Sequence, residues 1–186
     1  MSELKKKPIL DRCFVAVDID EEVRNRLSEV QNNFSDLGLK MIKPENMHIT
    51  LRFLGDVDSE IAKEDMRFFD GFPEFEISVV GLGSFPRILW AGVKEGASEL
   101  EELSQIAKKI SVGNVYKESR NFSAHITIAR DIDGAIKTAA EDIEGMKNMD
   151  FGRFSVKEIK LKKSSLSAEG PLYSDIYSVR TMSAKS

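Results

Sequence analysis

The sequence predicts an α+β fold, in which lobes of antiparallel sheet carry helices on their outer faces. Several segments rich in β-branched and aliphatic residues are joined by connections of hairpin length, too short for the crossover that parallel strands require. Between them lie segments whose apolar residues recur at three- and four-residue steps, as expected of helices that bury one face. A third observation is a four-residue pattern that occurs twice, at 48–51 and 125–128. This repeat indicates two similar lobes.

Length and composition set the outer limits. The 186 residues suit one domain with a substantial core, or two small lobes that share one. A hydrophobic content of 41% and a charged content of 31% exclude a disordered chain and a membrane-embedded one. The net charge of −4 argues against nonspecific coating of nucleic acid, which depends on many phosphate contacts, but allows an enzyme that grips one terminal phosphate.

The first ten residues do not resemble an export signal, and no linker divides the chain. Residues 1–10 contain three lysines in a row and predict a flexible tail that lacks the apolar core of a secretion signal. No apolar run approaches the length of a membrane span, so we expect a cytoplasmic protein without a membrane partner. No stretch rich in proline, glycine or serine divides the chain, so we treat 1–186 as one bilobal domain.

The first half of the chain alternates strand and helix patterns. In the first strand, the single cysteine, Cys13, shares a face with Val15 and Val17 and is expected to be a buried apolar residue. Asp18 or Asp20 can cap the helix that follows, and Gly38 ends it. The expected elements, in order, are a strand at 12–18, a helix to about 37, a short strand at 40–43, a turn at 44–46, a strand at 47–54 and a helix at 59–69.

The second half is similar in character. A glycine- and proline-containing turn separates two strand-like runs, and a long amphipathic segment follows them. The expected elements, in order, are strands at 75–82 and 88–93, a helix at 97–110, a strand ending at 130, a helix at 134–146, and strands at 151–162 and 172–180.

The two histidines of the protein, His48 and His125, each begin the repeated pattern of histidine, isoleucine, threonine and an aliphatic residue. In a strand, side chains two apart point to the same face, so His48 shares a face with Thr50, and His125 with Thr127. Such a pair lies roughly 6.5 Å apart along the backbone, close enough to contact different oxygens of one phosphate. One such strand alone is usually no more than a strand with a polar face. The duplication favours a function.

Two imidazoles from two strands can supply one general base and one general acid, the pair that phosphodiester cleavage requires in the absence of a metal. An ordinary histidine pKa of about 6.5 allows one ring to be neutral and the other protonated near neutral pH. The carboxylates lie in runs on helix faces and not at ligand spacing, and no glycine-rich phosphate loop is present. We therefore expect no metal and no other cofactor.

The paired motifs resemble those of the 2H phosphoesterase superfamily, and their surroundings are similar to its RNA 2′,3′-cyclic phosphodiesterase branch, also called 2′-5′ RNA ligase. The similar segments, which span the chain from about residue 12 to 179, are 12–18, 44–55, 86–93 and 166–173. The family often has proline just before the second motif histidine, where this sequence has Ala124.

This resemblance implies two sheets related by a pseudo-twofold axis, with the active cleft between the lobes. It implies that His125 is the base on water, that His48 is the acid to O3′, and that Arg130 contacts the phosphate. The residues alone leave these two roles open, because the motifs are nearly symmetric. Strict alternation turns Arg130 away from His125 unless the strand twists or ends near Ala129. Arg52 lies two residues beyond Thr50 and is expected on the motif face, at the surface or the cleft rim.

We expect a monomer that hydrolyses a 2′,3′-cyclic phosphate, either at the end of an RNA such as a tRNA fragment or in a cyclic nucleotide. Two alternatives stay open from the sequence. One is the joining of such an end to a 5′-hydroxyl as a 2′-5′ linkage, which the same histidines could catalyse. The other is a noncatalytic protein that binds RNA ends or nucleotides.

Overall fold

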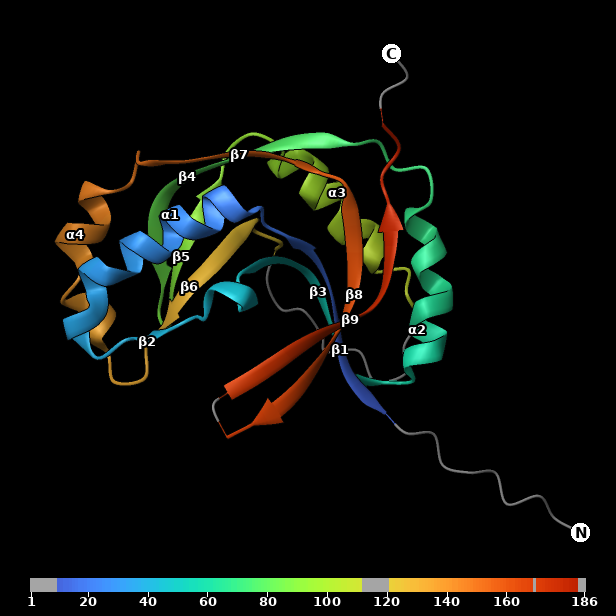
Figure 1. Cartoon of the computed structure of the whole chain (residues 1–186), viewed down its shortest axis with the longest axis horizontal. Helices are drawn as coiled ribbons and strands as arrows, with labels where there is room; N and C mark the ends of the chain where they lie inside the picture. The colour runs from blue at the N-terminus through green and yellow to red at the C-terminus, as the bar shows by residue number, and fades with distance from the viewer. Residues whose placement is uncertain (1–9, 112–120, 169, 184–186) are drawn as a thin grey trace, which may run out of the picture.

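The computed structural model describes residues 10–111, 121–168 and 170–183, so the tail expected at 1–10 lies outside the described residues except for Leu10. Within these ranges, nine strands form one curled sheet in the order β7-β4-β5-β6-β3-β1-β8-β9, with β2 beside β6 (Figure 1). Each pairing between these strands is antiparallel. The strands are β1 (Asp11–Asp18), β2 (Lys40–Met41), β3 (His48–Val57), β4 (Phe75–Phe85), β5 (Ile88–Val93), β6 (His125–Arg130), β7 (Asp150–Val156), β8 (Glu158–Ser167) and β9 (Gly170–Arg180).

The sheet has two halves that meet at its centre, which confirms the expected α+β fold with two antiparallel lobes. One lobe is β7-β4-β5-β6 and the other is β3-β1-β8-β9. The join is the pair β3 and β6, the two strands that carry the repeated motif, and its register partners are Ile49 and Ile126. The two lobes therefore share one sheet, and each contributes one motif strand to the middle.

The helices pack on one face of this sheet, and α1 and α3 exchange lobes. Helix α1 follows β1 in the chain but packs on β6 and β7 of the other lobe, while α3 follows β5 but packs on β3. Helices α1 and α4 lie together on one side of the molecule and α2 lies on the other (Figure 1). This exchange ties the lobes together. The helices are α1 (Glu21–Gln31), α2 (Ser59–Asp65), α3 (Ala97–Ala107) and α4 (Ala140–Gly145), with 3₁₀ turns η1 (Asn32–Leu37), η2 (Pro44–Asn46), η3 (Met66–Phe69) and η4 (Ala135–Lys137).

The core lies between the helices and the sheet, and it draws on both lobes. Ile49 and Leu51 of β3 and Ile126 and Ile128 of β6 are buried in it, whereas the motif histidines and threonines lie on the opposite face and are half-buried. This alternation is the one expected from the motif. Cys13 is also buried as expected, and burial raises the pKa of its thiol to about 11.

Helices α1, α2 and α3 begin where the sequence indicates, and α3 ends at Ala107, before the expected end at 110. Asp20 caps α1 by accepting a hydrogen bond from the Val23 backbone N–H at 2.9 Å, which settles the choice between Asp18 and Asp20. Gly38, at a left-handed φ of 73°, ends the segment that continues α1 as η1. The helices expected at 59–69 and 134–146 are each shorter, with a 3₁₀ turn at 66–69 and at 135–137.

Two strand predictions were wrong. The strand expected at 40–43 is limited to Lys40–Met41. The single strand expected at 151–162 is divided at Lys157 into β7, which pairs with β4 at one edge of the sheet, and β8, which pairs with β1 and β9 near the other. Both pieces have strand-like composition, so the local sequence pattern does not reveal the break. The break arises because the two pieces pair with strands at different places in the sheet.

Candidate active site

The two histidines lie on neighbouring strands at the centre of the sheet. Each precedes one member of the Ile49–Ile126 pair that joins the lobes. One residue along from this pair, antiparallel order brings His48 to the side of Thr127 and His125 to the side of Thr50. The fold thus gathers the four motif side chains on one face, as the repeat predicts.

Both imidazoles are held in the same way. Nδ1 of His48 donates to the backbone carbonyl of Asn46 at 2.7 Å, and Nδ1 of His125 donates to that of Ser123 at 2.7 Å. Because a carbonyl oxygen can only accept, both rings carry a proton on Nδ1, which leaves Nε2 as the reactive nitrogen. Nε2 of His48 also lies 3.0 Å from the hydroxyl of Thr50. This is the nitrogen through which a ring could exchange a proton with substrate.

Aromatic rings flank each histidine. Around His48 the ring centroids of Phe14 and Tyr173 lie 4.9 and 5.3 Å away. Around His125 those of Phe85 and Trp90 lie at 5.3 and 6.5 Å. Rings at these distances restrict the imidazoles to one orientation and exclude water from part of their surface.

Glycine makes room for one of these rings. The indole of Trp90 lies so close over Gly83 that a Cβ there would come within 2.3 Å of it. Any larger side chain at this position would therefore displace the ring that borders His125.

The pKa of His48 is lowered to about 4 in the free protein. Burial is the main cause, and the carbonyl of Asn46 opposes it. Among the charged groups nearby, Lys162 and Arg130 lower the pKa further, while Asp18 raises it. His48 is therefore neutral at neutral pH before substrate binds.

Arg130 reaches the histidine face through a β-bulge. In the pairing of β5 with β6, Leu89 is opposite Ala129 and Trp90 is opposite Thr127, so Ile128 has no partner on β5 and the alternation shifts by one residue. The bulge breaks the strict alternation of β6 just before Ala129. Arg130 therefore lies on the same face as Thr127 and His125. Arg130 is exposed there.

The first motif has the same bulge, and it sends Arg52 to the core. Val15 is opposite Arg52 and Ala16 is opposite Thr50, so Leu51 is the extra residue. Arg52 is only 6% exposed and donates to the carbonyls of Ala107 at 2.6 Å and Ile110 at 3.4 Å, at the end of α3. The expectation that Arg52 lies on the motif face was wrong.

The position that corresponds to Arg130 in the first lobe is held by Phe53, not by a cation. Phe53 is the register partner of Phe14, whose ring contacts His48, so it lies on the histidine face. It is 55% exposed. The two lobes thus place an aromatic ring and a guanidinium at equivalent points, and the site is chemically asymmetric despite its symmetric backbone.

A cluster of four charges lies next to His48 and was not predicted. Asp18, the register partner of His48, accepts from Lys160 at 2.7 Å and from Lys162 at 2.8 Å. Asp175 accepts from the same two lysines at 2.7 and 2.6 Å. Burial alone would raise the pKa of Asp18, but the hydrogen bonds from the two lysines outweigh it and lower the pKa. Because β8 is an inner strand of the sheet, Lys160 and Lys162 do not form a basic sheet edge, and both are paired with carboxylates.

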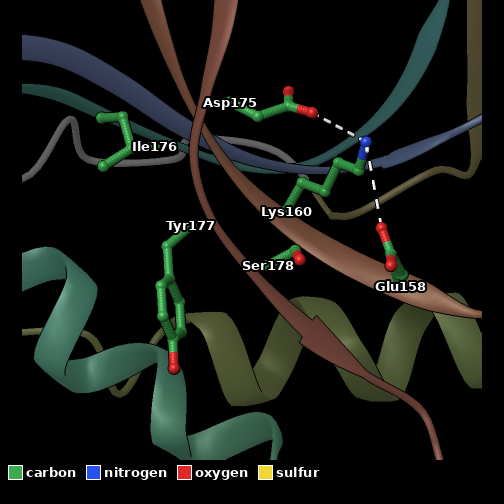
Figure 2. Close-up of a pocket in the computed structure, with 6 residues that line it drawn as sticks. All are labelled: Glu158, Lys160, Asp175, Ile176, Tyr177 and Ser178. Atoms are coloured by element: carbon green, nitrogen blue, oxygen red, sulfur yellow. Dashed lines mark hydrogen bonds and ion pairs between the residues drawn. The ribbon is translucent and has the colours of Figure 1, made fainter.

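A shallow hollow of about 410 Å³ adjoins this cluster on β8 and β9 (Figure 2). Figure 2 shows Lys160 pointing toward Asp175 and Glu158, while Tyr177 points away from them toward a helix. Neither histidine lines this hollow, so the pair at the centre of the sheet remains the candidate site. The lining residues are Glu158, Lys160, Asp175, Ile176, Tyr177 and Ser178.

No group of three or more histidine, cysteine, aspartate or glutamate side chains in 10–111, 121–168 and 170–183 is arranged to hold a metal ion. Within the same ranges, no helix has both the length and the apolar character needed to cross a membrane.

Comparison with known proteins agrees with this geometry. The family model described as LigT like Phosphoesterase matches twice, at residues 17–94 and 91–173, so each match contains one histidine motif. The chain belongs to this family. The resemblance to the 2H phosphoesterase superfamily is thereby confirmed, and the LigT-like fold accounts for the two lobes around a central motif pair.

Several curated relatives of this LigT-like chain are similar over nearly their whole length. The chain is 36% identical over 170 residues to the RNA 2′,3′-cyclic phosphodiesterase of Methanocaldococcus jannaschii, covering 87% of this chain and 96% of the relative. It is 33% identical over 173 residues to the protein of the same name from Archaeoglobus fulgidus, covering 89% and 97%.

Solved structures show the same LigT-like fold. A protein from Thermus thermophilus superposes with a TM-score of 0.75 at 26% identity, covering 91% of this chain and 97% of that one. Escherichia coli LigT complexed with 3′-AMP superposes with a TM-score of 0.74 at 21% identity, covering 92% and 98%. At that lower identity, the likeness concerns the fold alone.

Proposed function

We propose that this chain hydrolyses the 2′,3′-cyclic phosphate at an RNA 3′ end to a 2′-phosphate, using His48 and His125 as acid and base. The observation that carries this proposal is that the two lobes hold two imidazoles on one face, each with its Nδ1 hydrogen-bonded to a backbone carbonyl, which leaves Nε2 as the nitrogen for proton transfer. The curated relatives named RNA 2′,3′-cyclic phosphodiesterase support the choice of substrate.

The reaction needs one proton taken and one given. The base removes a proton from water as the water oxygen bonds to phosphorus, in line with the bond from phosphorus to O3′. As that bond breaks, the acid protonates O3′, which leaves a free 3′-hydroxyl and a 2′-phosphate. Solvent then restores the starting protonation of both rings.

The phosphate is held by hydroxyls and a guanidinium in this proposal. Thr50 and Thr127 donate to the non-bridging oxygens, and Arg130 adds positive charge as negative charge builds up in the transition state. In the free protein the hydroxyl of Thr50 is 3.0 Å from Nε2 of His48. On binding, Thr50 turns to the phosphate and frees this nitrogen for proton transfer.

For the roles, we keep the assignment implied by the family resemblance, with His125 as base and His48 as acid. The low pKa of His48 means that the ring is neutral before binding and must gain its proton together with the substrate. The phosphate anion placed beside the ring favours the charged imidazolium and raises its pKa. Binding of the substrate thus favours protonation of His48, the general acid of the reaction.

We also propose that one chain is a complete enzyme, a single bilobal domain that acts as a monomer in the cytoplasm. Both histidines come from the same chain, so no second copy is required to build the site. The RNA ends on which it acts include fragments of tRNA.

Activity in the presence of a strong chelator tests the metal-free mechanism. Acid, base and phosphate-binding groups are all side chains here, so hydrolysis of a 2′,3′-cyclic mononucleotide should continue at an unchanged rate. Complete loss of activity, restored by a divalent ion, would refute the two-histidine mechanism. Binding of the cyclic nucleotide without turnover would instead identify a noncatalytic binder.

Ligation and hydrolysis can be compared in the same reaction. Both would use the same two histidines, because a 5′-hydroxyl can take the place of water as the nucleophile at phosphorus while O3′ leaves in either reaction. Supplying an RNA with a 2′,3′-cyclic end together with an RNA bearing a 5′-hydroxyl, and measuring both products, gives the balance. We expect the hydrolysed 2′-phosphate end to dominate, since water is in great excess over RNA ends.

A further inference from the structure

Lys40 and Arg130 form an unusual pair next to the histidines. They are register partners in the antiparallel pairing of β2 with β6. Residues directly opposite each other in such a pair project to the same face, with their Cβ atoms roughly 4.5–5.5 Å apart. Two cations therefore lie side by side.

The pair lies on the face that carries the site. Arg130 is also the register partner of Ile88 on β5. Because Leu89 is fully buried in the core, its neighbours Ile88 and Trp90 point to the other face, and the ring of Trp90 lies near that of His125. Lys40 is thus on the histidine face, on β2, which pairs with the same edge of β6 as β3 does.

Within the described part of the chain, no carboxylate neutralises these two cations. Both side chains are exposed, and neither has a hydrogen bond or an ion pair to another described residue. The carboxylate nearest in sequence, Asp131, is occupied by backbone N–H groups of residues 133–136 at 2.7–3.1 Å. Like charges directly opposite each other destabilise a sheet, and an anion bound between them would relieve this repulsion.

The opposite end of the site is different. There Lys160 and Lys162 are matched by Asp18 and Asp175, so their charges are cancelled. An RNA strand that leaves the histidines toward β2 meets the positive charge of Lys40, which no carboxylate of the described residues neutralises. In the direction of β8 and β9 it would meet lysines whose charge is already neutralised. The charge distribution therefore favours an RNA strand that leaves the histidines toward β2.

We propose that Lys40 binds the phosphodiester on the 5′ side of the terminal nucleotide, so that an RNA strand runs from the histidines past Arg130 onto β2. This inference rests on the proposed function. Arg130 contacts the cyclic phosphate, and Lys40 extends the site by one phosphate. The preferred substrate is accordingly an RNA strand and not a free cyclic nucleotide. With a chain charge of −4, few further contacts are available, so the salt dependence is shallow.

The test compares two substrates in three proteins. The substrates are a four-nucleotide RNA with a 2′,3′-cyclic phosphate end and a 2′,3′-cyclic mononucleotide. The proteins are the wild type, Lys40→Met, which keeps an unbranched side chain without the charge, and Lys109→Met as a matched control. Lys109 is an exposed lysine after α3, the helix that packs on the opposite face of the sheet.

Lys40→Met should lower kcat/KM about fivefold for the tetranucleotide, through KM, and leave the mononucleotide unchanged. The slope of log kcat/KM against log salt concentration should fall by about 0.7 for the tetranucleotide, the loss of one single-strand phosphate contact. The loss should be equal for uridine and adenosine sequences, because phosphate contacts do not read bases. Lys109→Met should match the wild type.

Two outcomes with the Lys40→Met variant would overturn the subsite. One is wild-type kinetics of Lys40→Met on the tetranucleotide. The other is an equal loss on both substrates, which would mean that Lys40 supports the catalytic site itself. Wild-type protein that turns over the mononucleotide without preferring the tetranucleotide refutes the subsite alone, whereas inactivity on both substrates refutes the proposed function.

Discussion

Ile49 of β3 and Ile126 of β6 are register partners, and through them the two lobes meet. Both are fully buried, and each is preceded in sequence by one of the two histidines. The rigid centre of the sheet thus sets the spacing of the imidazoles. A pair held in this way should act as one catalytic unit.

His48→Ala and His125→Ala should each lower kcat by about 10²- to 10⁴-fold, the usual contribution of one positioned acid or base. The double variant should lose far less than the product of the two single losses, because the residues act together. Steady-state kinetics on a cyclic nucleotide gives these values. Wild-type rates in both single variants would end the enzymatic interpretation.

A better leaving group separates the two roles. A nitrophenyl phosphodiester needs little protonation of its leaving oxygen, so it should rescue the variant that lacks the acid and not the one that lacks the base. We expect rescue of His48→Ala. If His125→Ala is rescued instead, the assignment of acid and base is reversed.

Thr127→Val keeps the shape of the side chain and removes its hydroxyl. If that hydroxyl donates to the phosphate in the transition state, kcat should fall roughly 10²-fold while the free energy of unfolding changes little. Thr138→Val, at an exposed position outside the motifs, is the control and should retain full activity. Unchanged kinetics in Thr127→Val would return this threonine to a purely structural role.

Arg52→Met tests the position of Arg52 in the core. The variant loses the hydrogen bonds to Ala107 and Ile110, so the free energy of unfolding should fall by about 1–3 kcal/mol, measured by urea denaturation. The kcat of the folded variant should stay within about twofold of the wild type, because the guanidinium lies on the face away from the histidines.

The comparison variant for Arg52 is Arg12→Met. Arg12 makes an exposed ion pair with Asp56 at 3.8 Å, so its loss should change stability by less than about 1 kcal/mol. A large drop in kcat with unchanged stability in Arg52→Met would place Arg52 at the site after all.

The buried state of His48 predicts a pH dependence of stability. The pKa is about 4 in the folded protein and about 6.5 in an unfolded chain, so between these values only the unfolded state binds the proton. Stability should therefore fall as the pH drops from 6.5 toward 4, and the contribution of His48 should level off below 4.

Urea denaturation of the wild type and of His48→Gln from pH 7.5 to 4.5 isolates this contribution, since all other titrating groups are common to both. The free energy of unfolding of the wild type, relative to that of His48→Gln, should fall as the pH drops below about 6.5. Parallel curves for the two proteins would show that His48 titrates normally.

Features that depend on neighbours along the chain could be predicted from the sequence alone. The period of two in each motif strand places His48 and Thr50 on one face and Ile49 on the other, because alternation is a local property of extended backbone. The cap of α1 is local in the same way, since the Asp20 carboxylate reaches the N–H of a residue three positions on; the sequence narrowed the cap to Asp18 or Asp20, and the structure chose Asp20. The duplication of the motif also predicted the two lobes.

Tertiary structure alone decided two features. One is the position of the β-bulges, where the alternation of side chains fails, and the other is which charged residues from distant parts of the chain come together. A bulge depends on the register of the adjacent strand, so nothing within the motifs tells that Arg130 turns toward the site while Arg52 enters the core. Lys162 finds Asp18 and Asp175 on two other strands, and Lys40 finds Arg130, because strands from distant parts of the chain pair there. Such contacts depend on strand order and register, which the periodicity of a single strand does not encode.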